Sequence, residues 1–277
     1  MSLPRGWKPA ELAEPAGRVS AAFLALHVPG SPLLMPNPWD VGTARVLVEL
    51  GFAALATTSS GHAATLGKLD GQVGRADAIA HAAALAAAVP VPVSADLENG
   101  FADDPTGVAA TVEAAAATPL QGCSIEDRGP GGLYPLELAV ERVAAAAKAA
   151  AGRLVLTARA EAFLLPEPDL ADVVARLQRF AEVGADVVYA PGLSRPADIA
   201  TVVAEVDRPV NVLLRPGGPT VAELADLGVA RISVGGAFAF AGLGALARAA
   251  RELLDGGPAT FWDDAAVGAR LARAAFD

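Results

Sequence analysis

Carboxylate side chains stand at the ends of two short apolar segments of this chain. The segment VPVSADLENGF at residues 91–101 contains Asp96 and Glu98, and the segment CSIEDR at 123–128 contains Glu126. Each apolar run is too short for a helix and is typical of a β-strand. Carboxylates that meet at the C-terminal ends of parallel strands suit a hard divalent cation, because such a cation prefers oxygen ligands. The pattern therefore predicts metal-assisted chemistry with Mg²⁺, or alternatively with Mn²⁺.

A permanently charged arginine ends a third strand-like segment, at residues 153–159. Side chains alternate between the two faces of a strand, so Asp96, Glu126 and Arg159 each share a face with the smaller residues that precede them. The planar guanidinium of Arg159 suits a substrate carboxylate or phosphonate that is held beside the metal. Its alternative role is structural, as the counter-charge to Glu126 or Glu161.

Strand-like and helix-like segments alternate along the whole chain. The expected strands are residues 33–37, 53–57, 91–96, 121–126, 153–159, 186–190, 209–214 and 231–234. The expected helices that follow them are 41–50, 76–88, 106–117, 136–151, 170–183, 196–206, 221–227 and 237–254. Eight βα units predict an α/β fold of the (β/α)₈ TIM-barrel type, with residues 1–277 forming a single domain. A doubly wound sheet is the alternative, but the turn after the first expected strand, NPWDVGTA, lacks the GxGxxG pattern.

The tail at residues 256–277, GGPATFWDDAAVGARLARAAFD, is expected to form a helical extension of the barrel. It has the pattern of an amphipathic helix and carries Phe261 and Trp262 at its start. Aromatic side chains of this kind are unfavourable when they are left in water. The tail is therefore expected to pack either on its own barrel or on another subunit.

The composition excludes several classes of function. With 277 residues, of which 53% are hydrophobic and 19% charged, the chain can bury a large core. Its formal net charge is −10 and no basic cluster occurs, so we expect neither nucleic acid nor a membrane as a partner. The single cysteine, Cys123, excludes an intramolecular disulfide and a cysteine-based zinc site. The first residues lack the apolar core of a signal peptide, and we expect a cytoplasmic enzyme.

Six motifs occur in an order that resembles the isocitrate lyase/phosphoenolpyruvate mutase superfamily. They are PNPWDVGTARV, GFAALATTSSGHAATLGKLDG, VPVSADLENGF, GCSIEDR, LTARAEAF and GADVVYAPG, and the resemblance reaches to about Leu254. It implies a (β/α)₈ barrel, a Mg²⁺ cofactor, and a 2-oxo acid or phosphonate substrate whose enolate-like intermediate the metal stabilises. It also implies a homodimer that exchanges a C-terminal helix, or a homotetramer built from such dimers.

The resemblance also implies roles for individual residues. Asp96 resembles the principal metal-binding aspartate, and the acids that resemble water-mediated metal ligands are Glu98, Glu126 and Asp70. The substrate-binding residues that the resemblance implies are Trp39, Asp40, Thr58, Ser59, Ser60 and Arg159.

The segment after the fourth expected strand departs from this family pattern. The lyases carry lysine, cysteine, glycine and histidine there, and the mutases and phosphonate hydrolases carry a lysine, but this chain reads DRGPGGLYPLE. The phenol of Tyr134 is the group left on this lid with a pKa suited to proton transfer. The candidate catalytic residues are therefore Arg159, Glu126 and Tyr134. Cys123 falls on the opposite strand face from Glu126 and is expected in the core.

Three functions from different classes remain open. The first is a Mg²⁺-dependent carbon-carbon lyase or decarboxylase that acts on a small 2-oxo or 2-hydroxy acid, such as oxaloacetate, through an enolate. The second is a carbon-phosphorus mutase or hydrolase, which the missing lid lysine disfavours. The third is a non-catalytic protein that binds a 2-oxo acid with the same metal and carboxylate contacts.

Overall fold

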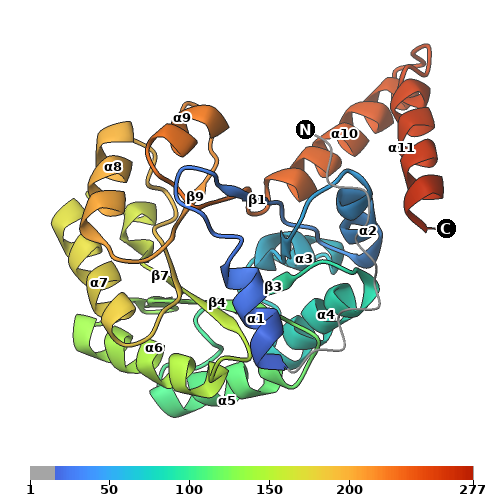
Figure 1. Ribbon diagram of the computed structural model, residues 1–277. Helices are drawn as coiled ribbons and strands as arrows, with labels where there is room; N and C mark the ends of the chain where they lie inside the picture. Colours follow the sequence, from blue (N-terminus) through green and yellow to red (C-terminus); the bar gives the residue numbers. More distant parts are fainter. Residues whose placement is uncertain (1–15, 277) are drawn as a thin grey trace.

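Eight parallel strands form a nearly closed barrel in the computed structural model, which describes residues 16–276 (Figure 1). The strands are β1 Leu33–Met35, β2 Leu55–Ala56, β3 Val93–Asp96, β4 Gly122–Glu126, β7 Val155–Arg159, β8 Val187–Tyr189, β9 Val210–Leu213 and β10 Arg231–Ser233. Their hydrogen-bonded order is β1-β10-β9-β8-β7-β4-β3-β2. Because β1 pairs with β10, the sheet curls on itself, which confirms the (β/α)₈ prediction over the doubly wound alternative.

A helix follows each barrel strand, and all of these helices except the last cover the outside of the sheet (Figure 1). These helices are α2 Val41–Glu49, α4 Arg75–Ala88, α5 Pro105–Ala116, α6 Leu136–Ala150, α7 Leu170–Glu182, α8 Pro196–Glu205, α9 Val221–Asp226 and α10 Ala237–Leu254. The carboxylates of Asp40, Asp104 and Asp169 accept hydrogen bonds from the first turns of α2, α5 and α7. Such caps satisfy backbone N–H groups that have no partner inside the helix, so these helices begin where the sequence predicts.

Four further elements were not predicted. They are α1 Ala16–Leu24, α3 Ser59–Thr65, the 3₁₀ helix Glu161–Leu164, and the hairpin of β5 Arg128–Gly129 with β6 Gly132–Leu133. Residues 58–60 are therefore not an irregular loop, because Thr58 caps α3 and accepts a hydrogen bond from the backbone N–H of Gly61 at 3.3 Å. Most of the N-terminal segment examined for a signal peptide lies outside the described residues.

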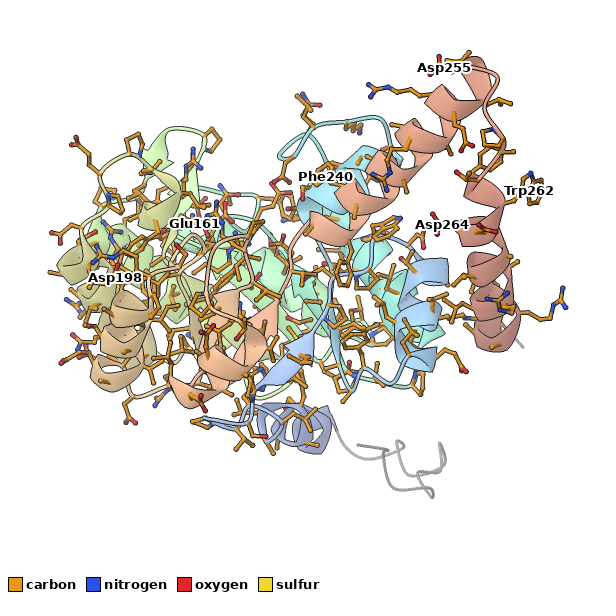
Figure 2. The ribbon with its side chains drawn as sticks, turned by 90° about the horizontal axis from the view of Figure 1, so that it is seen from above. Glu161, Asp198, Phe240, Asp255, Trp262 and Asp264 are labelled. Carbon is orange, nitrogen blue, oxygen red and sulfur yellow. The ribbon has the colours of Figure 1, made fainter. Side chains whose placement is uncertain are left out.

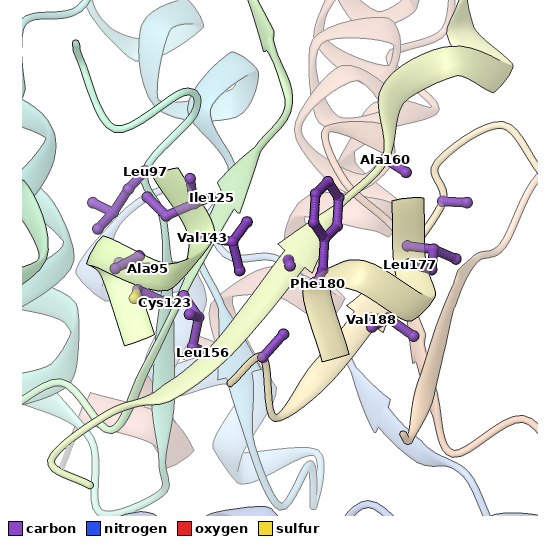
Figure 3. Close-up of a cluster of buried hydrophobic side chains, with 14 of the residues drawn as sticks. Ala95, Leu97, Cys123, Ile125, Val143, Leu156, Ala160, Leu177, Phe180 and Val188 are labelled. Carbon is purple, nitrogen blue, oxygen red and sulfur yellow. The ribbon is translucent and has the colours of Figure 1, made fainter. Parts of the chain in front are cut away.

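The main core lies between the sheet and the helices that surround it. The side chains of Ala95, Cys123 and Leu156 point outward from β3, β4 and β7 and pack against residues such as Val143 of α6 (Figure 3). Cys123 is fully buried there, which confirms its predicted place in the core, and burial raises the pKa of its thiol to about 12. Inside the barrel, Phe23 of α1 is fully buried in a smaller cluster and fills the N-terminal end.

The barrel closes between β1 and β2, which do not form a ladder of backbone hydrogen bonds. One backbone hydrogen bond and the side chain of Asn37 join them instead. The backbone N–H of Ala56 donates to the carbonyl of Pro36 at 3.1 Å. The side chain of Asn37 donates from Nδ2 to the carbonyl of Thr57 at 3.0 Å, and its Oδ1 accepts from the N–H groups of Val234 and Gly235 at 2.9 Å each. One buried amide thus joins β1, β2 and the end of β10.

The last two helices, α10 and α11 Phe261–Phe276, project away from the ring of the barrel (Figures 1 and 2). The ring of Phe276 of α11 lies near Gly42 of α2, yet no residue of α11 is buried. Large apolar side chains of both helices are exposed: Phe238, Phe240, Leu243, Leu246, Leu253, Leu254, Trp262, Val267 and Phe276. The expected helix therefore exists, and most of its apolar surface stays uncovered by its own barrel. Across residues 16–276, no helix combines the length and the apolarity that a bilayer span requires.

Candidate active site

A cavity of about 180 Å³ opens at the C-terminal ends of the barrel strands. Its wall contains the inward-facing side chains of Ser94 and Asp96 on β3, Ser124 on β4 and Arg159 on β7. Small hydroxyl residues thus lie beneath a charged residue on neighbouring strands, as strand alternation predicts. The cavity has room for a small molecule rather than a single water.

Asp96 is held at this wall by three elements. Its Oδ2 accepts a hydrogen bond from the backbone N–H of Ser59 at 3.1 Å, and its Oδ1 accepts from Nη1 of Arg159 at 2.8 Å. Its own backbone N–H donates to Oγ1 of Thr57 at 2.8 Å. Both carboxylate oxygens are therefore fixed in direction, and fixed oxygens are suited to holding a cation or a polar ligand.

Arg159 bridges three carboxylates, of which Asp96 lines the cavity and Glu126 and Glu161 do not. It lies 2.8 Å from Asp96, 3.1 Å from Glu126 and 2.8 Å from Glu161. Burial works against its charge, but Glu161, Glu126 and Asp96 together raise its pKa well above the ordinary range. The structural role considered for Arg159 is thus present. Its guanidinium also lines the cavity.

Two of the predicted metal acids carry raised pKa values. Burial, then the charges of Asp96 and Asp70, raise the pKa of Glu98 to about 7. Burial also raises the pKa of Glu126 to about 8, although Arg159 opposes the shift. The charges of neighbouring acids add to the effect of burial at both residues, and a bound cation would oppose the rise.

The donor set fits a hydrated Mg²⁺. Its members are all carboxylates, which are hard oxygen ligands, and Mg²⁺ usually takes one or two of them and keeps several waters. Within residues 16–276 no three acidic, histidine or cysteine side chains already stand as a ready-made metal cage. A Mg²⁺ ion bound here would take Asp96 as its direct ligand, and Glu98, Glu126 and Asp70 would reach it through water.

The loop after β3 is strained where it carries one of these acids. Glu98 has a φ of +49° and Phe101 a φ of +55°, both in the left-handed region. This region costs an L-residue roughly 1–2 kcal/mol. The backbone carbonyl of Glu98 accepts a hydrogen bond from the N–H of Glu126 at 3.0 Å, which ties the loop to β4. Strain that is held in place next to a cavity is typical of a functional site.

The other predicted substrate-binding residues separate into two groups. Thr58, Ser59 and Ser60 line the cavity at the start of α3. Trp39 and Asp40 do not line it, because the Asp40 carboxylate caps α2 together with Thr43. The Trp39 carbonyl lies 2.9 Å from Nε2 of His81, and its ring lies next to Gly242 of α10.

Tyr134 is engaged elsewhere than in the cavity. Its hydroxyl donates to Oδ1 of Asp103 at 2.5 Å and accepts from Nδ2 of Asn99 at 2.9 Å. The guanidinium of Arg142 stacks on its ring at 4.0 Å. Burial and the bond to Asp103 raise the pKa of the phenol. In this arrangement Tyr134 fastens the β5–β6 hairpin to the loop after β3.

Several polar residues of the last strands also line the cavity, although none of them was singled out from the sequence. They are Tyr189 on β8, Asn211 on β9, and Arg231 and Ser233 on β10. All four stand inside segments that were predicted as strands. The sequence signal that could have identified them is a polar side chain at an inward position of an otherwise apolar strand.

Comparison with known proteins agrees with this geometry. A solved structure from Burkholderia cenocepacia J2315, provisionally assigned as a lyase/mutase, is 47% identical, with a TM-score of 0.82 over 86% of this chain and 88% of its own. An uncharacterized Mycobacterium tuberculosis protein is 36% identical over 85% of this chain and 90% of its own length. The structure of 2,3-dimethylmalate lyase is 26% identical, with a TM-score of 0.77 and 87% of each chain covered.

The family itself is also evident over most of the chain. Residues 23–254 match the model of the phosphoenolpyruvate phosphomutase family. This range contains all eight strands of the barrel and every residue that lines the cavity. The resemblance seen in the sequence motifs is thereby confirmed. The chain belongs to the phosphoenolpyruvate phosphomutase family, within the isocitrate lyase/phosphoenolpyruvate mutase superfamily of enzymes.

Proposed function

We propose that the protein is a Mg²⁺-dependent enzyme that acts on a small 2-oxo or 2-hydroxy acid through an enolate, as a carbon-carbon lyase or an oxaloacetate decarboxylase. The observation that carries this proposal is the contact of Asp96 with Arg159, 2.8 Å apart on the wall of one cavity. A carboxylate suited to a cation and a guanidinium suited to a carboxylate thus stand side by side. A ligand with a carboxylate next to a carbonyl or hydroxyl can use both.

The residues have separable roles in this proposal. Asp96 would hold Mg²⁺ directly and Glu98, Glu126 and Asp70 through water, and the ion would supply stabilisation for negative charge on the substrate oxygen. Arg159 would bind the substrate carboxylate, since it is fixed by its neighbours and retains its charge. The hydroxyls of Thr58 and Ser60, 3.2 Å apart, would donate to the ligand from the start of α3.

The lid favours a reaction that needs little proton transfer. The β5–β6 hairpin carries no lysine, cysteine or histidine, and the Tyr134 hydroxyl is bound to Asp103. Cleavage of a carbon-carbon bond to an enolate requires a positioned acid or base, typically worth about 10²–10⁴-fold in rate. Decarboxylation needs less, because the departing CO₂ leaves an enolate that solvent can protonate. Similarity to 2,3-dimethylmalate lyase supports the broader class of carbon-carbon lyases.

A second candidate is binding of a 2-oxo acid without turnover. The engagement of Tyr134 away from the cavity favours it, because no acid or base on the lid then faces the ligand. The carbon-phosphorus mutase or hydrolase remains the third possibility. The family match includes phosphomutases, but the lid lacks the lysine that the resemblance leads us to expect.

Parallel assays distinguish these functions. Purified protein with Mg²⁺ is offered oxaloacetate, 2-methylisocitrate and phosphonopyruvate, each with and without EDTA, and oxalate binding is measured by calorimetry. We expect Mg²⁺-dependent oxalate binding, slow release of pyruvate from oxaloacetate, and little cleavage of the other two. Binding without turnover would favour the second candidate. Failure to bind oxalate at all in the presence of Mg²⁺ would contradict the proposal.

A further inference from the structure

A second arginine lines the cavity, deeper in the barrel than Arg159. Arg231 is the first residue of β10 and is only 4% exposed. Its Nε donates to Oδ1 of Asn211 at 3.0 Å, and its Nη1 donates to Oγ1 of Thr157 at 3.1 Å. Its Nη2 has no hydrogen-bond acceptor within residues 16–276. Donors of the guanidinium are therefore left over for a ligand.

A third polar neighbour of Arg231, His27, is neutral. Its Nδ1 lies 3.1 Å and 3.2 Å from the carbonyl oxygens of Phe23 and Leu24, and because a carbonyl can only accept, Nδ1 carries the ring hydrogen. Its Nε2 is then the acceptor that faces Nη1 of Arg231 at 3.5 Å. Burial, followed by the charge of Arg231, lowers the pKa of His27 to about 4. His27 thus contributes no charge at neutral pH.

Arg231 is therefore a buried cation for which residues 16–276 supply no carboxylate partner. Burial lowers its pKa to about 10, which still leaves it protonated at neutral pH. A buried charge without a counter-charge is costly, and an anion that enters the cavity would offset that cost. Arg142 is an instructive contrast, because it is also buried without such a pair but donates to backbone carbonyls outside the cavity.

The two arginines of the cavity lie at different depths. Thr157, which accepts from Arg231, precedes Arg159 by two residues on the same inward face of β7. Two residues of a strand span about 6.6 Å, so Arg231 contacts the barrel wall roughly one layer below Arg159. Arg159 is already paired with three carboxylates, whereas Arg231 is not. A short ligand with a carboxylate at each end could reach both.

We propose that Arg231 binds the second carboxylate of a dicarboxylate substrate and thereby selects dicarboxylic over monocarboxylic 2-oxo acids. This inference rests on the proposed function, because the first carboxylate is taken to lie beside Asp96 and Arg159. Arg231 is fixed from two sides by Asn211 and Thr157, so its fork is oriented before the ligand arrives. The N–H groups of Nη2, which have no acceptor within residues 16–276, would then donate a charge-assisted hydrogen bond to that carboxylate.

The test compares ligands that differ only in the charge of the distal group. The two ligands are oxaloacetate and 2-oxosuccinamate, in which the distal carboxylate is replaced by a neutral amide and the first carboxylate is kept. The affinity of each is measured at low temperature by competition against oxalate in the presence of Mg²⁺. We expect the wild-type protein to bind oxaloacetate about 10- to 100-fold more tightly than the amide. Arg231→Met should reduce this ratio to about threefold or less while oxalate, which has no distal carboxylate, keeps its affinity.

Controls separate selection of the ligand from support of the barrel. Arg195→Met removes the same charge from a side chain that is 78% exposed and outside the cavity, and it should leave the ratio unchanged. Arg231→Lys keeps a positive charge and should retain part of the preference for oxaloacetate over the amide. If Arg231→Met binds oxalate normally and still prefers oxaloacetate over the amide by the wild-type ratio, the role of Arg231 is overturned and the proposed function is not. If Arg231→Met does not fold, the wild-type ratio decides, because equal binding of acid and amide overturns the inference. Absence of oxalate binding to the wild-type protein overturns the proposed function as well.

Discussion

Nη1 of Arg159 and Oδ1 of Asp96 lie 2.8 Å apart, although the two residues are 63 positions apart in the chain. Each ends a barrel strand, and β4 lies between those strands in the sheet. The contact therefore depends on three consecutive strands keeping their register. Asp96 pairs with Arg159 and is also the proposed direct ligand of Mg²⁺, so it is the most informative residue to change.

Asp96→Asn should abolish Mg²⁺-dependent binding of oxalate. The amide keeps the size of the side chain but loses the charge that would hold the ion, while the contact with Arg159 loses its ionic character. Calorimetric titration with oxalate, with and without Mg²⁺, measures the effect. Asp255→Asn, at the exposed end of α10, is the matched control and should bind normally. Unchanged affinity in Asp96→Asn would contradict the metal assignment.

His27 should make the protein less stable as the pH falls from about 6.5 to 4. The unfolded chain takes up a proton at the ordinary pKa of 6.5, whereas the folded protein resists until about 4, so folding is favoured on the high-pH side. This pKa shift contributes about 3 kcal/mol to the free energy of unfolding. The contribution is fully present above pH 6.5 and is lost progressively below it. Urea unfolding of the wild-type protein and His27→Gln over this range measures it. Equal pH slopes for the two proteins would show that His27 does not titrate as described.

Tyr134→Phe should affect stability more than chemistry. Removing the hydroxyl takes away the hydrogen bonds to Oδ1 of Asp103 and from Nδ2 of Asn99, at a cost of about 1–2 kcal/mol. Because the hydroxyl is bound outside the cavity, we expect oxalate affinity to be retained and any decarboxylation rate to fall by less than about tenfold. Denaturant unfolding and initial rates are measured on the same samples. A rate loss of about 10²-fold or more would instead support the catalytic role that the sequence predicts for Tyr134.

The protein should associate with itself through α10 and α11. Their exposed apolar side chains form a surface that is unfavourable in water, and the sequence resemblance implies dimers that exchange a C-terminal helix. Light scattering at micromolar concentration should give a dimer or a tetramer. The double variant Leu246→Asp, Trp262→Asp should dissociate it, whereas Arg248→Asp, Asp263→Arg changes charge without removing apolar surface. A wild-type monomer would refute the prediction.

The positions of Asp96, Glu126 and Arg159 could be predicted because strand alternation is a local rule. Once three short apolar runs are recognised as strands, their last inward residues follow from a period of two. The eight βα units follow from the same reasoning, and the first residues of several helices follow from N-capping residues such as Asp40.

The rest of the site depends on contacts between distant parts of the chain. Arg231 was visible as the start of a strand, but its partners lie on β7, β9 and near α1, and only closure of the barrel brings them together. The short helix at residues 59–65 was not predicted, because serine and glycine favour turns and give no helix signal there, although Thr58 caps it. Asp40 was expected at the pocket wall, but its carboxylate is used locally to begin α2.

The Asn37 amide has a consequence for the order in which the barrel comes apart. Neighbouring strands elsewhere in the sheet are joined by backbone ladders, but the junction of β1 with β2 relies on this side chain and on the Ala56–Pro36 hydrogen bond. Local opening should therefore begin at this junction, and the amide hydrogens of Ala56, Val234 and Gly235 should exchange with solvent before those of β4 and β7. Asn37 also lines the cavity, so a ligand that fills the cavity would hold the junction shut and slow that exchange.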